Sequence, residues 1–152
     1  MQMLNPLDLK SALLAKHAQH VVLVHFPIAL YLAGTAADFC ARIFRKAGLL
    51  EVARWNFLAA AVLSIPTAAT GILAWQWALE GQALKGILRF HLLLASVTVL
   101  ALWITYWLRS RRNQGFRGTC PGWLLLAEGV VCALIAITAH LGGFLSGVNT
   151  GH

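Results

Sequence analysis

The chain has 152 residues, of which 59% are hydrophobic and only 11% are charged. A soluble domain is usually about 45–50% apolar and roughly 25% charged, so this composition excludes an ordinary water-soluble fold and favours a membrane protein in contact with the lipid bilayer. The net charge of +7 does not indicate a nucleic-acid partner, because the basic residues lie between apolar runs rather than along one face.

Residues 1–19 lack the basic start, the continuous apolar stretch and the cleavage site of a signal peptide. This segment is predicted either to form a short amphipathic helix on the bilayer surface or to be a frayed end of the chain.

Four segments are apolar enough to cross a bilayer, which takes roughly 20 residues in a helix. They cover residues 20–44, 53–79, 84–108 and 121–147. Polar and glycine-containing segments separate them, and no internal repeat is evident. The sequence therefore predicts one domain over residues 1–152, with an all-α fold: an integral-membrane, up-and-down four-helix bundle.

The orientation of the bundle follows from Lys and Arg near the span ends, which favour the cytoplasmic side. One side carries eight such residues and the other side carries four. The eight are Arg42, Arg45, Lys46, Arg54, Arg109, Arg111, Arg112 and Arg117, and the four are Lys10, Lys16, Lys85 and Arg89. We therefore expect both termini to lie outside the cytoplasm.

Three histidines lie inside the predicted spans, where an ionisable side chain is costly and usually functional. His25, His91 and His140 each lie within about two helical turns of the outer end of a span, so three helices bring an imidazole to one layer. Small residues such as Ala95 and Ala136 lie one turn from them and mark close helix contacts. These histidines are therefore expected to point into the bundle.

Facing imidazoles in a helical bundle are what bis-histidine haem ligation requires, so a non-covalent haem b is the first cofactor prediction. Covalent haem is excluded because the chain has no C-x-x-C-H motif. His25 and His91 are the favoured axial pair, because the first and third helices lie diagonally in such a bundle. His140 would replace His91, bind a haem propionate, or form a second site with His20.

Lys85 and Arg89 lie on the same outer side and are candidates to neutralise haem propionates. Their other possible role is to reach lipid headgroups. Two alternatives to haem remain open for His25, His91 and His140. They would hold Zn or Cu as a metal site, or they would serve only packing in a membrane anchor or accessory subunit of a larger complex.

Two carboxylates lie in the inner halves of the predicted spans. Asp38 precedes Arg42 by one helical turn, which predicts an i,i+4 ion pair. Glu128 has no such partner in its own helix, and its functional interpretation is a proton path or a carboxylate at a quinone site.

Several motifs together resemble a family of small bacterial membrane proteins called domain of unknown function 2231. These are His20-V-V-L-V-His25-F-P-I, Asp38, T-A-A-T-G ending at Gly71, His91, and T-A-H-L-G-G from Thr138 to Gly143. The resemblance covers nearly the whole chain. Val21 stands where the family usually has proline, and the tail after Gly143 replaces a more aromatic ending.

The family is similar to domains fused or adjacent to redox modules, including Rieske-type iron–sulfur domains, and this resemblance implies electron transfer. We therefore expect a haem protein of the bacterial inner membrane with both termini periplasmic. It would carry electrons between a quinone pool or redox complex and a periplasmic redox protein, dehydrogenase or iron–sulfur subunit. We expect an electron-transfer protein or subunit rather than a stand-alone enzyme, either within a larger complex or as a homo-oligomer.

Overall fold

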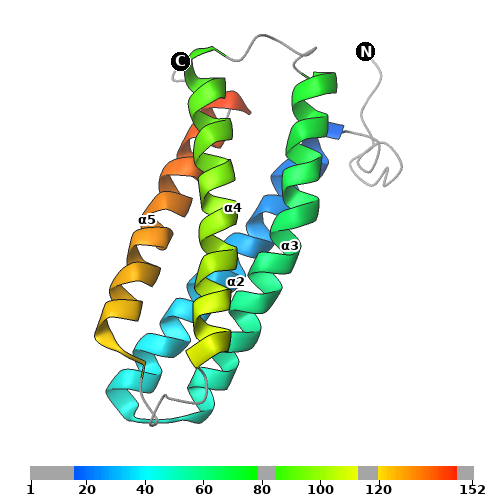
Figure 1. Ribbon diagram of the computed structural model, residues 1–152. Helices are drawn as coiled ribbons and strands as arrows, with labels where there is room; N and C mark the ends of the chain where they lie inside the picture. The colour runs from blue at the N-terminus through cyan, green and yellow to red at the C-terminus, as the bar shows by residue number, and fades with distance from the viewer. Residues whose placement is uncertain (1–15, 79–84, 113–119, 147–152) are drawn as a thin grey trace.

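The computed structural model of the protein describes residues 16–78, 85–112 and 120–146, and these residues form four helices (Figure 1). The helices are α2 (Lys16–Phe44), α3 (Gly48–Ala78), α4 (Gly86–Arg112) and α5 (Gly122–Leu145). Each is long and apolar enough to cross a membrane. The predicted all-α four-helix fold is therefore confirmed. Most of segment 1–19, for which a surface helix was one expectation, lies outside the described residues.

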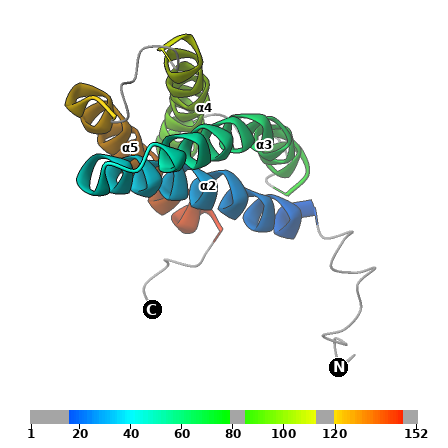
Figure 2. The ribbon, with the colours of Figure 1, turned by 90° about the horizontal axis from the view of Figure 1, so that it is seen from below.

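The helices run alternately up and down, so the start of α2 and the end of α5 lie at the same end of the bundle (Figure 1). We call this the outer end, and we call the end with the α2–α3 turn the inner end. Helices α3 and α5 each pack against both α2 and α4, which lie diagonally opposite each other. Helices α2 and α3 make the most extensive contact and lie side by side in Figure 2.

Helix α3 begins at Gly48, earlier than the predicted start at residue 53. The N–H groups of Leu49 and Leu50 donate to the carbonyls of Lys46 and Ala47 at 3.1 and 3.0 Å, which forms the extra turn. Leu50 is buried against the end of α2 and the start of α5. Tertiary packing therefore extends the helix beyond the apolar run that the sequence shows.

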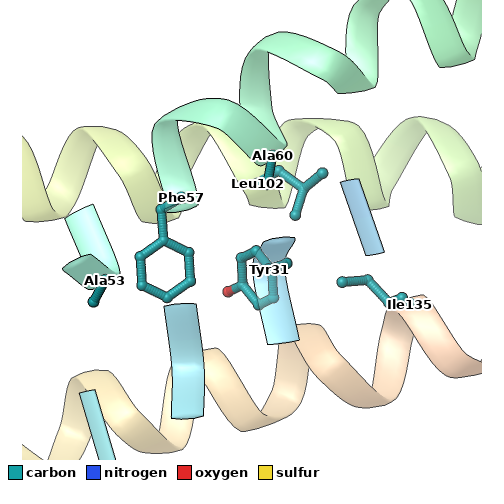
Figure 3. Close-up of a cluster of buried hydrophobic side chains, with 6 residues drawn as sticks. All are labelled: Tyr31, Ala53, Phe57, Ala60, Leu102 and Ile135. Carbon is teal, nitrogen blue, oxygen red and sulfur yellow. The ribbon is translucent and has the colours of Figure 1, made fainter. Parts of the chain in front are cut away.

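A layer of side chains, one from each helix, closes the middle of the bundle (Figure 3). It consists of Tyr31, Phe57, Leu102 and Ile135, all of them buried. The rings of Tyr31 and Phe57 meet edge to face with their centroids 4.9 Å apart. The Tyr31 hydroxyl lies 3.1 Å from the hydroxyl oxygen of Thr105 on the diagonal helix α4, which satisfies the buried phenol. This middle layer separates the inner half from the outer half.

A cluster of charged side chains in the inner half joins all four helices. Arg109 of α4 donates to both carboxylate oxygens of Asp38 on α2. The same guanidinium donates to Glu128 Oε1 on α5 and to the Leu50 carbonyl on α3, each at 3.3 Å. It also lies 5.1 Å from the centre of the Phe57 ring. Arg109 is 1% exposed and both acidic side chains are 0% exposed, so these polar groups contact one another rather than water.

The predicted ion pair between Asp38 and Arg42 is wrong. Arg42 is exposed, and its Nη1 donates to the Cys120 carbonyl at 2.8 Å, next to the start of α5. Asp38 points into the bundle, where the Cys120 thiol donates to its Oδ2 at 3.6 Å. Burial raises the pKa of the Cys120 thiol to about 12, so the thiol keeps the proton that it donates. A buried carboxylate takes its partner from across the bundle, which a pattern within one helix does not show.

The two helical hairpins, α2–α3 and α4–α5, repeat one pattern with an offset of 71 residues. With this offset, His20 corresponds to His91. Likewise, T-A-A-T-G at residues 67–71 corresponds to T-A-H-L-G at residues 138–142. In each hairpin the histidine Nδ1 lies 3.1 Å from a threonine carbonyl 47 residues later. The expectation that the chain has no internal repeat is therefore wrong. Parallel repeats of this kind are related by an axis along the membrane normal.

Removal of Arg109 is predicted to destabilise the bundle strongly. Arg109→Leu leaves two buried carboxylates without their cation, and breaking a buried ion pair costs about 3–5 kcal/mol. The measurement is the free energy of unfolding in detergent micelles. Arg111→Leu is the matched control, because Arg111 is exposed and lies over the Trp107 ring, with Cζ 4.8 Å from the ring centre. Equal losses in the two variants would contradict the prediction.

Candidate functional site

The outer half of the bundle contains an apolar cavity of about 710 Å³ between the two hairpins. Its wall consists mostly of aliphatic and small side chains from all four helices, and it includes three histidines, His20, His25 and His91. Leu102 and Ile135 of the middle layer also line it. Ligand sites usually have volumes of about 300–1,000 Å³ and a few polar groups on an apolar wall. We call this the outer cavity, and it is the candidate ligand site.

His20 lies near the outer end of α2, and its ring contacts α3. Nδ1 donates to the Thr67 carbonyl at 3.1 Å and lies 3.3 Å from the Thr70 hydroxyl oxygen. The ring packs on Gly71, where an added β-carbon would lie 3.0 Å from Cε1 of His20. A carbonyl only accepts, so Nδ1 carries a proton, and in the neutral ring the lone pair is on Nε2.

His91 repeats this arrangement near the outer end of α4. Its Nδ1 donates to the Thr138 carbonyl on α5 at 3.1 Å, and a β-carbon at Gly142 would lie 3.1 Å from Cε1 of His91. The Thr138 hydroxyl oxygen in turn lies 3.1 Å from that of Thr98 on α4. The lone pair of neutral His91 is therefore also on Nε2. A backbone carbonyl behind one ring nitrogen is the usual support of a histidine that binds a metal through the other.

His25 also lines the outer cavity, but its ring is held by its own helix. The side chain is exposed, and Nδ1 lies 2.6 Å from the Val21 carbonyl. Pro27, two residues later, is buried and has no N–H to donate to the Leu23 carbonyl one turn before it. The Thr67 hydroxyl has one proton, which lies between the Leu63 carbonyl at 2.8 Å in its own helix and the Leu23 carbonyl at 3.4 Å on α2. The turn of α2 that holds the H-F-P-I motif therefore contacts α3 at the wall of the cavity.

His140 does not face the outer cavity, and the prediction that its ring points into the bundle is wrong. The side chain is exposed, and its ring meets Phe144 edge to face with centroids 5.0 Å apart. A helix turns by about 100° per residue, so His140 lies roughly 200° from Thr138, which faces inward. Ala136, one turn from His140, is exposed as well.

The predicted metal site of His25, His91 and His140 is not assembled, because His140 lies outside the cavity that the other two line. Within residues 16–78, 85–112 and 120–146, the group of three metal-binding side chains whose ligand atoms lie within 4.8 Å of one another is a different one. It consists of Asp38, Cys120 and Glu128. A cation there would face the guanidinium that already binds both carboxylates.

Lys85 and Arg89 lie at the outer end of α4, and both side chains are exposed. Neither lines the outer cavity, although Leu88 and Leu92 beside them do. Lys85 and Arg89 are therefore close in sequence to residues that line the cavity, but they are not part of its wall.

Sequence reasoning missed the residues that hold the histidines in place. Thr67 and Thr138 supply carbonyls, Gly71 and Gly142 leave room for the rings, and Arg109 was counted only as a loop charge. The repeated T-A-x-x-G at residues 67–71 and 138–142, each following a histidine by the same 47 residues, is the signal that would have identified the threonines and glycines.

The fold and the site define a class of protein, a four-helix integral membrane protein with a histidine-containing cavity in one half of the bundle. A family model described as "Predicted membrane protein (DUF2231)" matches residues 16–151, and the chain belongs to this family. The resemblance seen in the sequence motifs is thereby confirmed at the level of the family. No curated protein and no solved structure matches the chain. The molecule is therefore a membrane-embedded protein whose exposed apolar helix faces contact lipid.

Glycines behind the two histidines are predicted to resist substitution by alanine. Alanine in place of glycine inside a helix usually stabilises it by about 1 kcal/mol. At Gly129 of α5 nothing lies within 4 Å of an added β-carbon, so Gly129→Ala should show this gain. Gly71→Ala and Gly142→Ala should lose stability instead, because the β-carbon would displace a histidine ring. Thermal unfolding of the three variants in detergent measures the difference, and a gain at all three positions would contradict the packing described above.

Proposed function

We propose that the protein binds a non-covalent haem b in the outer cavity and carries electrons between a quinone pool or membrane redox complex and a periplasmic redox partner. The observation that carries the proposal is the presence of histidines from two diagonal helices, α2 and α4, on the wall of one apolar cavity. Imidazoles that project from facing helices into a bundle are typical axial ligands of a haem. The haem would supply the one-electron chemistry.

The residues of the chain would bind and orient the haem. His91 is one proposed axial ligand, because it is half-buried in the cavity wall and its Nδ1 is held by a backbone carbonyl. His25, the partner favoured by the sequence, and His20 both line the opposite side of the cavity on α2. Aliphatic side chains around them would surround the haem with an apolar environment, which is one of the means by which a protein sets a haem potential.

Lys85 and Arg89 are proposed to pair with haem propionates that reach the outer surface. Arg89 follows the cavity-lining residue Leu88, and both basic side chains are exposed at that end of α4. Long basic side chains extend readily along apolar surface to reach a charged partner at an interface. The same chemistry binds lipid headgroups, so these two residues support the proposal less strongly than the histidines do.

Purified protein from a haem-replete host is predicted to show the reduced-minus-oxidised spectrum of a b-type haem, extractable by acidified acetone. His91→Ala should lose the low-spin spectrum, because it removes a ligand supported by the Thr138 carbonyl. Haem content per polypeptide and the absorption spectrum are the measurements.

His140→Ala is the matched control for that experiment. It removes an imidazole at a similar depth, but on the outside of α5, so its haem content should equal that of the unmodified protein. Purified protein without haem would contradict the proposal and favour a non-redox anchor or accessory subunit. Zinc or copper in stoichiometric amount would favour a metal site in place of a haem.

Both ends of the chain are predicted to face the periplasm. Arg109 lies in the buried charged cluster and no longer counts as a loop charge, yet the remaining basic residues at the inner end still outnumber those at the outer end. A phosphatase fused after His152 should therefore be active, and a fluorescent protein that folds only in the cytoplasm should be dark there. The opposite pair of results would invert the orientation of the bundle.

A further inference from the structure

The outer cavity is lined by two histidines that occupy equivalent positions in the two hairpins. The offset of 71 residues relates His20 to His91, just as it relates Asp38 to Arg109 in the inner half. Because each hairpin crosses the membrane twice, both repeats enter it in the same orientation. Equivalent residues therefore lie at similar depths, and α2 and α4, which carry these histidines, are diagonally opposite.

The equivalence extends to the way each ring is held. Nδ1 of both histidines donates to a threonine carbonyl of the second helix of its own hairpin, at 3.1 Å in each case. A glycine one turn after that threonine admits the ring, since a β-carbon at Gly71 or Gly142 would lie 3.0 or 3.1 Å from Cε1. Both neutral rings therefore have the lone pair on Nε2, which is the state that binds a metal ion.

His25 shares with His20 and His91 a backbone carbonyl behind Nδ1, but it lacks the other parts of this arrangement. Its Nδ1 contacts the Val21 carbonyl of its own helix, so no second helix fixes its ring. The residue of the second hairpin that corresponds to His25 with this offset is Ser96, which has no imidazole. Its side chain is exposed, whereas His20 and His91 are half-buried.

We infer that His20 and His91, the equivalent histidines of the two hairpins, are the two axial ligands of the outer-cavity haem, one from each repeat. The inference rests on the proposed haem binding and names the ligands of that site. The iron would lie between the two hairpins, and each Nε2 lone pair would occupy one axial position. His25 remains a wall residue, in the turn of α2 that contacts α3 beside the site.

The test is a set of three glutamine substitutions in the full chain, His20→Gln, His91→Gln and His25→Gln. Glutamine keeps a side-chain N–H for the threonine carbonyl, so the bundle should fold, but it offers no imidazole. We expect His20→Gln and His91→Gln each to convert the haem from low spin to high spin or to lose it, and the double variant to contain no haem. His25→Gln should keep a low-spin spectrum in the haem that it binds, because both proposed ligands remain.

Added imidazole distinguishes a lost ligand from a disturbed pocket. It should restore a low-spin spectrum in His20→Gln and His91→Gln, because a free imidazole can take the empty axial position. Low-spin haem that persists in His20→Gln, or is lost in His25→Gln, would overturn this assignment while the haem function stands. Absence of haem from the unmodified protein would overturn the proposed function and this assignment together.

Discussion

The buried guanidinium of Arg109 is the interaction on which the rest of the bundle depends. It binds carboxylates on α2 and α5 and a backbone carbonyl on α3, so one side chain holds all four helices at the inner end. In a hydrocarbon environment no water can replace a lost hydrogen-bond partner of Arg109. Separation of these helices would therefore leave its guanidinium without a carboxylate. The inner half is therefore closed, and helix order and depth are set there.

At the outer end, the hydrogen bonds described for the two histidines lie within a hairpin. At the inner end, Arg109 donates a hydrogen bond to Asp38 on the diagonal helix. In the middle layer, the hydroxyl groups of Tyr31 and Thr105 form a hydrogen bond between the same two helices. At the outer end, His20 and His91 each bond the neighbouring helix of the same hairpin. The charged cluster and the middle layer join the two hairpins, and the cavity lies between the hairpins at the outer end.

The two hairpins share the histidine arrangement but differ at the charged cluster. The same offset that relates one histidine to the other relates an aspartate on α2 to an arginine on α4. Equal charges at these two positions would repel across the bundle in a medium of low dielectric constant. Opposite charges attract, so this pair joins the two hairpins at the inner end, while like imidazoles occupy the equivalent positions at the outer end.

The sequence by itself determined the four helices, the membrane as their environment and the family. These properties follow from the length of apolar runs and from residue spacing along one helix, which are local. The tertiary structure decided the partner of Asp38, the outward face of His140 and the carbonyls behind His20 and His91. Each of these depends on which residues meet across the bundle, and rotation of a helix by two residues is enough to move a side chain from cavity to lipid. Asp38 and Arg109 are 71 residues apart and lie on diagonal helices, so the spacing of residues within either helix does not predict that they pair.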